Sequence, residues 1–360
     1  MNNLSIFKNL NWKLNFPILF LMGAGLLSLA STSLNLFYKQ IGWIFLGIII
    51  AALFIKIDWR SFVNQKGLIW GFYFLIFFIL IATLFFAPTI KGNRSWLVLG
   101  PLQFQPAEFA KLALILIYSA FFSRKHAAIA RISNLLVSFV YFLIPGLLIA
   151  LQPDFGSALV LFFIWLGFLF VSGIKWRHLL IVIFIFLISG VFMWFGILKD
   201  YQKERILGFI SPGRDPLGIN YSVIQSRVAI GSAGLFGKGF KQGTQAQLGF
   251  LPEKGTDFIF PAFTEEWGII AGFLVIAAFI FIIFQIMKIG LGANNNFNRF
   301  VCLGAVILFL SQFILNIGSA LGLTPVIGVT FPFFSYGGSS LLTNLSLVGI
   351  IQSIFRHRSL

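Results

Sequence analysis

Charged residues are scarce in this chain. Only 10% of its 360 residues are charged, against about 25% in an ordinary soluble domain, and 59% are hydrophobic. Apolar runs of about 20 residues, the length of helix that crosses roughly 30 Å of hydrocarbon, recur from end to end. No gap between them is long enough for a soluble domain of typical size. The composition therefore excludes a soluble protein and predicts an all-α integral membrane protein.

Cysteines and carboxylates are also rare. Cys302, the single cysteine, lies within an apolar run and cannot form an intramolecular disulfide, so cysteine usage says nothing about the compartment. Asp and Glu number 10 against 26 Lys and Arg, a net charge of +16. Such an excess could indicate a nucleic-acid partner, but the basic residues follow the loops between the apolar runs. We therefore expect no nucleic acid to bind.

About ten spans are predicted, and an even number places both termini on one side. If that side is cytosolic, with the N-terminal stretch as a tail and not a signal peptide, its loops hold fourteen of the 26 basic residues, while the short loops opposite hold only Lys39, Lys91 and Arg94. This asymmetry orients membrane proteins, so we predict a multi-pass protein of the bacterial cytoplasmic membrane with cytosolic termini. The spans are 15–34, 41–56, 68–87, 106–122, 134–151, 155–172, 179–197, 258–287, 300–322 and 335–355. The fourteen residues are Lys8, Lys13, Lys56, Arg60, Lys66, Arg124, Lys125, Arg131, Lys175, Arg177, Lys288, Arg299, Arg356 and Arg358.

The longest connection, about 198–257, is predicted to be extracytoplasmic. Its stretch 201–210 is amphipathic and suits the membrane interface. The apolar, glycine-punctuated stretch 221–240 is expected to fold back onto the bundle and partly re-enter the membrane, which is allowed where backbone is buried in protein. We expect one membrane domain, 1–360, with this large partly re-entrant loop between spans 7 and 8.

Acidic residues gather on the predicted outer side, with Asp58 the exception. Orientation does not require this, because acids contribute little to it, but chemistry on that side would. The densest group is Glu253, Asp257, Glu265 and Glu266 in GFLPEKGTDFIFPAFTEEWG, residues 249–268. Asp257 could be a helix N-cap, yet an acid at the lip of a span also lies where a lipid-linked head group would. Glu265 and Glu266, about two turns deeper, are interpreted as partners for cations inside the bundle.

A second group is QPAEFAK, in which Glu108 and Lys111 share one helix face at i, i+3. One interpretation is an internal ion pair that neutralises two costly charges. The other is that the pair faces a cavity shared with Asp257. Arg94, in the preceding loop, would add a planar guanidinium suited to phosphate.

The remaining candidates lie in three other stretches. Asp154, after Pro153, is interpreted mainly as an ordinary helix start. Arg205 and Arg227 lie in apolar company and are better placed than other loop cations for a pyrophosphate. Histidines occur only in predicted cytosolic loops, and GSAGLFGKGF is no dinucleotide fingerprint because no strand precedes it. No cofactor is certain; a divalent cation, Mg²⁺ or Mn²⁺, could assist at a pyrophosphate.

Four motifs occur along the ten predicted spans in this order: GNRSWLVLGPLQFQPAEFAKLA, LQPDFGSALV, residues 201–260 and GLTPVIGVTFPFFSYGGSSLL. Together they resemble the SEDS family of bacterial cell-wall polymerases, the RodA and FtsW proteins. Within the third motif, KGFKQGTQAQLGFLPEKGTDFIF is similar to the RodA, elongation branch. Many members have a histidine before the Thr-Asp, where this chain has Gly255, a residue expected to loosen the backbone beside Asp257.

The resemblance implies a glycosyltransferase that polymerises lipid II at the outer face of the membrane. The family's essential aspartate falls on Asp257 and its membrane glutamate on Glu108. Asp257 would take the proton of the attacking sugar hydroxyl, and Glu108 would orient Lys111 or bind substrate. Glu253 could contact substrate or metal. A class B penicillin-binding protein transpeptidase and other elongation-complex proteins are the implied partners. The cations expected to hold pyrophosphate are Arg94, Lys111, Arg205 and Arg227.

Three alternatives stay open. A lipid II flippase would also bury polar residues near one face, but transporters tend to show inverted repeats and broken helices in both halves, and none is visible. An FtsW-like division role is the second alternative. A scaffold that only recruits a transpeptidase would leave the buried ionisable residues without a purpose.

Overall fold

The computed structural model describes residues 10–59, 66–90, 92–100, 102–125, 132–196, 198, 200–211, 218 and 220–359. Most of this part of the chain is helical. Its elements are α2 (Trp12–Thr32), α3 (Leu34–Lys56), α4 (Lys66–Phe86), β1 (Leu97–Leu99), β2 (Leu102–Phe104), α5 (Pro106–Lys125), α6 (Ile132–Leu151), α7 (Phe155–Val171), α8 (Trp176–Gly196), α9 (Asp200–Ile210), α10 (Tyr221–Gly231), α11 (Thr244–Gln247), α12 (Ile259–Leu291), α13 (Asn296–Leu321), α14 (Gly338–Arg356) and a 3₁₀ turn, His357–Ser359.

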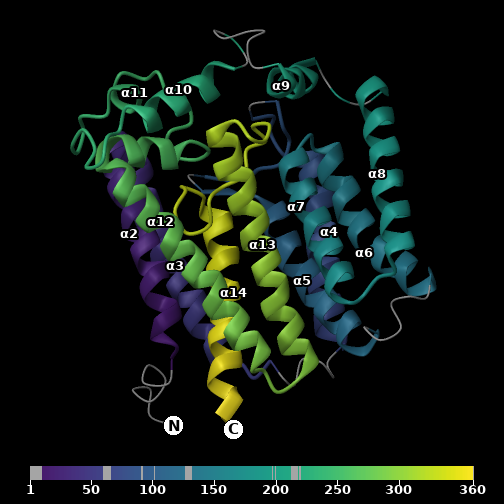
Figure 1. Cartoon of the computed structure of the whole chain (residues 1–360). Helices are drawn as coiled ribbons and strands as arrows, with labels where there is room; N and C mark the ends of the chain where they lie inside the picture. Colours follow the sequence, from purple (N-terminus) through teal and green to yellow (C-terminus); the bar gives the residue numbers. More distant parts are fainter. Residues whose placement is uncertain are drawn as a thin grey trace.

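The long helices run up and down between two ends, and the N and C labels lie together at one end (Figure 1). Within the described residues, nine helices are long and apolar enough to cross a membrane, and α7, with 17 residues, is a shorter apolar helix. The chain is an all-α multi-pass membrane protein. The order of these apolar helices follows that of the predicted spans, and the number that crosses the membrane, ten, stays a prediction.

Two of the connections between helices differ from the sequence prediction. Only Ser33 separates α2 from α3, so the second span begins at Leu34 and Lys39 lies in a helix, not in a loop. Ser33 allows this sharp joint because it caps α3: its side chain accepts a hydrogen bond from the N–H of Leu36. The residues 87–106 also contain a short antiparallel hairpin, β1 paired with β2, which no alternation in the sequence had indicated.

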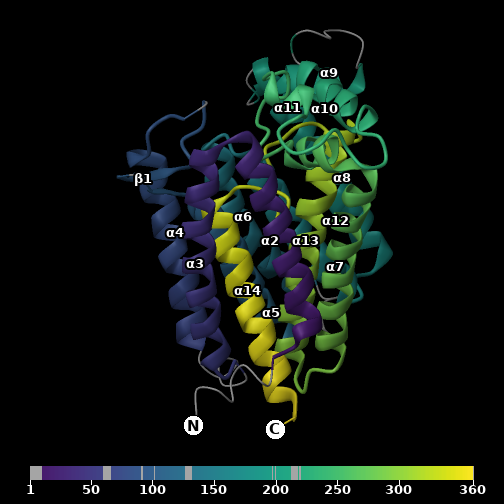
Figure 2. The ribbon, with the colours of Figure 1, turned by 90° about the vertical axis from the view of Figure 1, so that its left-hand side faces the viewer.

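The core is built around α14 and α5. Every α14 residue from Gly338 to Ile354 is buried, and α14 runs through the middle of the bundle in Figure 2. Its neighbour α3 approaches closely because Gly349 has no side chain: a Cβ there would lie 2.7 Å from the carbonyl oxygen of Ala51. Small residues at such crossings let membrane helices pack backbone to backbone. At the other extreme, α8 stands at the edge of the bundle (Figure 1).

The helices of the long connection, α9, α10 and α11, cap the end of the bundle opposite the termini (Figure 1). α10 packs on α12 and α13. It also caps α13, whose last carbonyls have no partner within the helix. Ser226 Oγ donates to the carbonyl of Ala320 at 2.6 Å, and Arg227 Nε donates to that of Leu321 at 2.9 Å. The stretch 221–240 thus folds back onto the bundle as predicted; its re-entry into the membrane stays a prediction.

One predicted span is a broken helix. Gly268, with φ 86° and ψ 168°, interrupts α12. Residues 234–239 fill the break: Lys238 and Gly239 N–H donate to the carbonyls of Glu265 and Glu266, each at 3.0 Å. On the other side of the break, the carbonyls of Gly234 and Leu235 accept from Ile269 and Ile270, at 3.0 and 3.3 Å. These four bonds to the inserted loop give partners to the carbonyls of Glu265 and Glu266 and to the N–H groups of Ile269 and Ile270, which would bond to each other in an unbroken helix.

Several sequence predictions fall outside the described residues. They are those for the loop cations Lys8, Arg60, Lys91 and Arg131, for His126, one of the histidines in predicted cytosolic loops, and for Asp215, one of the acids predicted on the outer side.

Candidate functional site

Asp257 lies in the turn before α12, and α12 begins at the end of the bundle that carries α9 to α11 (Figure 1). The N-cap position of α12 belongs to Phe258, which makes no side-chain cap bond. The N-cap interpretation of Asp257 was therefore wrong: the residue lies one position too early. Its side chain is half-buried, and Glu253, at the start of the same turn, is exposed with a φ of 47°.

Three consecutive backbone carbonyls of this turn accept hydrogen bonds from α13 and from the connection between α13 and α14, residues 322–337. Gly255 O accepts from the N–H of Tyr336 at 2.9 Å. Thr256 O accepts from Ser335 Oγ at 2.7 Å, and Asp257 O accepts from Asn316 Nδ2 at 3.2 Å. The turn is thereby fixed through its main chain.

Gly255 lies in a tightly packed part of this turn, and the looser backbone expected of it stays a prediction. It is buried, and a Cβ there would lie 2.9 Å from Leu36 Cδ1 and 3.2 Å from Leu29 Cδ2. Two leucines of α2 and α3 thus lie where a side chain at position 255 would begin. In the family pattern a histidine side chain occurs at this position; here, leucine side chains occupy that space.

Arg205 and Arg227 line one cavity of about 270 Å³ between α9, α10 and the 322–337 connection. Both side chains donate to main-chain carbonyls of its wall: Arg205 Nη1 to Val326 at 3.2 Å, and Arg227 Nη2 to Gly322 at 3.3 Å. The two arginines that the sequence analysis named, twenty-two positions apart, therefore line the same cavity. Ser222 and Thr324 add hydroxyls to its lining.

The Glu108–Lys111 pair is an internal ion pair. Lys111 Nζ lies 2.6 Å from Glu108 Oε1, and the two residues are 1% and 5% exposed. Glu108 Oε2 is buried without a hydrogen-bond partner in the described part of the chain. Neither residue lines the arginine cavity. Arg94 is exposed, and its Nε donates to Thr89 Oγ1 at 3.2 Å.

Asp154 is the N-cap of α7, as the sequence indicated. Its Oδ1 accepts from the N–H of Ser157 at 3.1 Å, and its Oδ2 accepts from Gln105 Nε2 at 2.7 Å. Gly156, two residues on, packs so tightly that a Cβ would lie 2.3 Å from the carbonyl oxygen of Ile327. The start of α7 therefore lies directly against the 322–337 connection.

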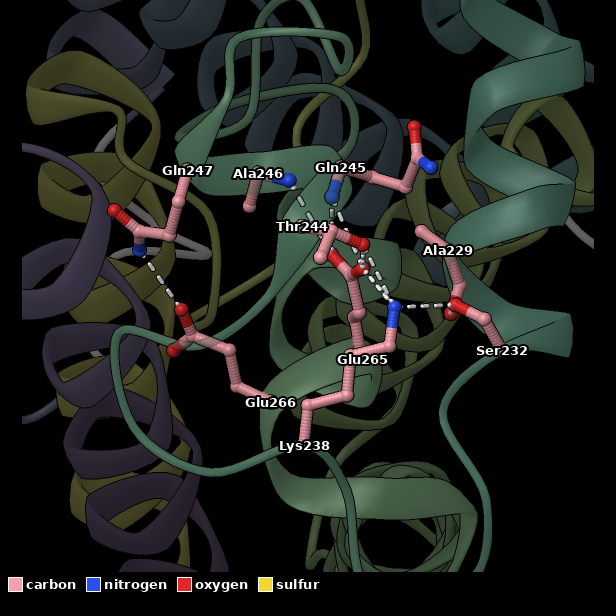
Figure 3. A network of polar contacts seen from close by, with 9 residues as sticks. All are labelled: Ala229, Ser232, Lys238, Thr244, Gln245, Ala246, Gln247, Glu265 and Glu266. Carbon is pink, nitrogen blue, oxygen red and sulfur yellow. Dashed lines mark hydrogen bonds and ion pairs between the residues drawn. The ribbon is translucent and has the colours of Figure 1, made fainter.

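Glu265 and Glu266 lie at the helix break and differ from each other (Figure 3). Glu265 is fully buried and pairs with Lys238 Nζ at 2.7 Å, which confirms the predicted cation partner. Glu266 is 2% exposed and bonds instead to Ser31 Oγ and to Gln247 Nε2, the latter at 2.9 Å. A cation partner for Glu266 does not occur in the part of the chain that the structure describes, because its other oxygen, Oε2, has no bond there.

The 322–337 connection is the element that sequence reasoning missed. It contacts the Asp257 turn, the start of α7 and the arginine cavity, and so joins candidates spread over more than a hundred residues. Its motif was recognised, but no residue in it was given a role. The glycines at 322 and 328 were the sequence signal for an ordered segment that is not helical. In the structure both have positive φ angles, 69° and 71°, which glycine adopts without strain.

No group of three or more His, Cys, Asp or Glu side chains that could hold a metal ion occurs among the described residues. The expectation of a divalent cation is not tested by this.

A model of the FtsW/RodA/SpoVE family of cell cycle proteins matches residues 10–360. The chain belongs to this family. Among SEDS proteins, it is 35% identical over 333 residues to the peptidoglycan glycosyltransferase MrdB of Escherichia coli K12, covering 92% of this chain and 89% of that protein. It is 34% identical over 333 residues to the stage V sporulation protein E of Bacillus subtilis, covering 90% and 88%.

Solved structures agree with this membership of the SEDS family. A chain from a peptidoglycan synthase complex that coordinates polymerization and crosslinking superposes with a TM-score of 0.82 at 33% identity, covering 97% of this chain and 98% of that one. The rod shape determining protein RodA of Thermus thermophilus superposes with a TM-score of 0.72 at 29% identity, covering 98% of each chain.

Proposed function

We propose that this protein is a peptidoglycan glycosyltransferase of the RodA, elongation branch, which polymerises lipid II into glycan strands. The observation that carries the proposal is the near full-length similarity to the glycosyltransferase MrdB, joined to a fixed turn that presents Asp257 at one end of the bundle. Asp257 is the general base in this proposal. Family membership supports the reaction class, and the geometry supports the place where it occurs.

The reaction requires a base and an anion site. The hydroxyl oxygen of the incoming lipid II bonds to the anomeric carbon of the donor glycan, the bond from that carbon to the undecaprenyl pyrophosphate breaks, and Asp257 receives the hydroxyl proton. Sugar hydroxyls are weak acids, so removal of the proton as the bond forms lowers the barrier. The pyrophosphate departs as an anion and needs preorganised cations more than a general acid.

Arg205 and Arg227 are the best placed cations for that anion. Each guanidinium is held by wall carbonyls of a single cavity, so its position is set before substrate arrives. Lys111 is a weaker candidate, because Glu108 already holds its ammonium at 2.6 Å in a buried pair. Arg94 lies on the exposed loop before the hairpin and would reach a phosphate only from outside.

The proposal includes orientation and partners. Both termini face the cytosol of the bacterial inner membrane, which places Asp257 at the outer face; the basic loops near the termini support this. A class B penicillin-binding protein would supply cross-linking within an elongation complex, and the similarity to a synthase complex that coordinates polymerization and crosslinking supports such a partner.

The decisive experiment is polymerisation of lipid II by the purified full chain in detergent, with and without a class B transpeptidase. Wild-type protein is expected to yield glycan strands that muramidase degrades, whereas Asp257→Asn yields none and keeps the wild-type melting temperature. Asp58→Asn, the same change at the opposite end of the bundle, is the matched control and keeps activity. Normal polymer from Asp257→Asn would refute the base assignment.

The same experiment separates a flippase from a polymerase. Detergent leaves no membrane to cross, so polymer formed there cannot come from transport.

A divalent cation is tested in the same assay: the carboxylates of Glu253 and Asp257, on one turn, are ligands that Mg²⁺ or Mn²⁺ prefers. Activity lost with EDTA and regained with either ion would support it, and activity unaffected by chelation would contradict it.

A further inference from the structure

The amide of Asn316 joins two backbone segments, the turn that carries Asp257 and the 322–337 connection. Asn316 is on α13, five residues before its end, and is 1% exposed. Its Nδ2 donates to the carbonyl of Asp257 at 3.2 Å and to that of Val329 at 2.8 Å. One side chain thus contacts both the turn before α12 and the 322–337 connection.

The orientation of this amide is set by its surroundings. A primary amide carries two N–H donors on one nitrogen and an acceptor on the other atom. Two carbonyl oxygens that converge on one point can be satisfied only by the nitrogen, because the amide oxygen there would face two other oxygens. Asn316 Oδ1 is buried and makes no hydrogen bond in the described part of the chain, so no competing partner turns the group.

The carbonyls of Asp257 and Val329 lie close to the two groups that the proposed reaction uses, the Asp257 carboxylate and the arginine cavity. Asp257 Oδ2 is 3.9 Å from the position that a Cβ on Gly328 would occupy, so the carboxylate lies against the residue next to Val329. Two residues before Gly328, the carbonyl of Val326 accepts from Arg205 Nη1. Asn316 therefore fixes the Asp257 turn relative to the strip of main chain, 326–329, that also holds a guanidinium of the anion cavity.

We propose that Asn316 is a positioning residue, which sets the distance between the Asp257 base and the arginine cavity by bonding one amide nitrogen to both segments. The proposal rests on the function proposed above. A base and an anion site must stand at a set separation, since the hydroxyl loses its proton at one while the pyrophosphate departs toward the other. Misplacement of a reacting group by about 1 Å can lower a rate about 100-fold.

The other bonds of the turn do not replace this one. Tyr336 N–H and Ser335 Oγ hold Gly255 and Thr256, and both donors come from the far end of the 322–337 connection. Only the Asn316 bond, among those on these three carbonyls, ends on Asp257 itself and reaches residue 329 at the same time. Loss of the amide should leave the turn attached but free to shift against Gly328.

The test compares Asn316→Ala and Asn316→Leu with Ser311→Ala. Leucine keeps most of the volume and removes both donors. Ser311 is a buried polar residue of the same helix whose hydroxyl donates to Leu308 within that helix. In lipid II polymerisation we expect both Asn316 variants to lower kcat about 10- to 100-fold with KM changed less than about twofold, and Ser311→Ala to match wild type.

A second measurement tests whether Asn316 holds the Asp257 turn, and it does not depend on enzyme activity. The N–H groups of Thr256 and Phe258 both donate to the carbonyl of Glu253. Hydrogen–deuterium exchange at 253–258 should be faster in both Asn316 variants and unchanged in Ser311→Ala. Unchanged exchange, or a wild-type kcat with faster exchange, would overturn the proposal. A wild-type protein that makes no glycan would refute the proposed function, and the exchange result would still decide whether Asn316 holds the turn.

Discussion

Asp257 and Glu265 lie on the same short stretch, before and within the first half of α12, and their surroundings are opposite. Glu265 is fully buried, and its oxygens accept from Lys238 Nζ, Thr244 Oγ1 and the N–H groups of Gln245 and Ala246. The Asp257 side chain is half-buried, and the bonds that fix its turn end on main-chain carbonyls.

This difference separates a structural carboxylate from a candidate base. A carboxylate whose lone pairs already accept four donors has little capacity to take a proton from a substrate. The Asp257 turn is instead held by hydrogen bonds to its main-chain carbonyls, and the Asp257 side chain is only half-buried. Substitutions at the helix break should therefore change stability, whereas substitution of the Asp257 carboxylate itself should change turnover.

The largest effect on stability is expected from Gly268→Ala. The residue has φ 86°, and a Cβ would lie 2.2 Å from Leu235 O and 2.5 Å from Gly237 N. Backbone strain of about 1–3 kcal/mol adds to the expulsion of the inserted loop. We expect a melting temperature at least several degrees below wild type. Gly23→Ala, in α2 with nothing within 4 Å, is the control and should change stability by less than about 1 kcal/mol. Equal melting temperatures would contradict the inserted-loop account.

Lys238→Met should come next. It leaves the Glu265 carboxylate buried without its cation, a change that costs about 3–5 kcal/mol for a fully buried pair and less here, because the Lys238 side chain is 26% exposed. The double variant with Glu265→Gln should recover part of the loss, since no unpaired charge then remains. Thermal unfolding of the four proteins in one cycle gives the coupling energy. Additive losses would show that the pair is not coupled.

Gly255→His tests the turn itself. Restoring the family's usual residue inserts a side chain against Leu36 and Leu29, and overpacking of this kind costs about 1–3 kcal/mol. Adding Leu36→Ala should relieve the clash and recover stability. Calorimetry or a thermal shift assay in detergent measures both variants. If Gly255→His alone is as stable as wild type, Leu36 and Leu29 move aside at little cost and the overpacking prediction is wrong.

The smallest effect is expected at Asp154. Asn caps helices about as well as Asp, so Asp154→Asn should change stability by only a few tenths of a kcal/mol, whereas Asp154→Ala should cost about 1 kcal/mol. Urea or thermal unfolding of both variants measures the difference. A raised KM for lipid II in the stable Asp154→Asn variant would show that the residue also binds substrate.

The candidate site was predictable in part. The Glu108–Lys111 pair follows from i, i+3 spacing within an apolar run, and the cap role of Asp154 from its place after Pro153, because both are local effects. The placement of Arg205 beside Arg227 was not predictable, since it depends on α10 capping the end of α13. The break in α12 was also invisible: Gly268 within an apolar run reads as an ordinary helical glycine.

The sequence alone determined that this is a multi-pass helical membrane protein, and it also determined the order of the spans and the SEDS motifs. Both the length of an apolar run and the spacing of motif residues are local properties of the chain, so they need no tertiary structure. Only the tertiary structure decided which carboxylate is enclosed and which is presented. That choice depends on hydrogen bonds between distant segments: the main chain of residues 234–239 at the break, and the Asn316 and Ser335 side chains with the N–H of Tyr336 at the Asp257 turn. At least one partner in each of these bonds is a main-chain group, which every residue carries, so no pattern of side chains predicts them.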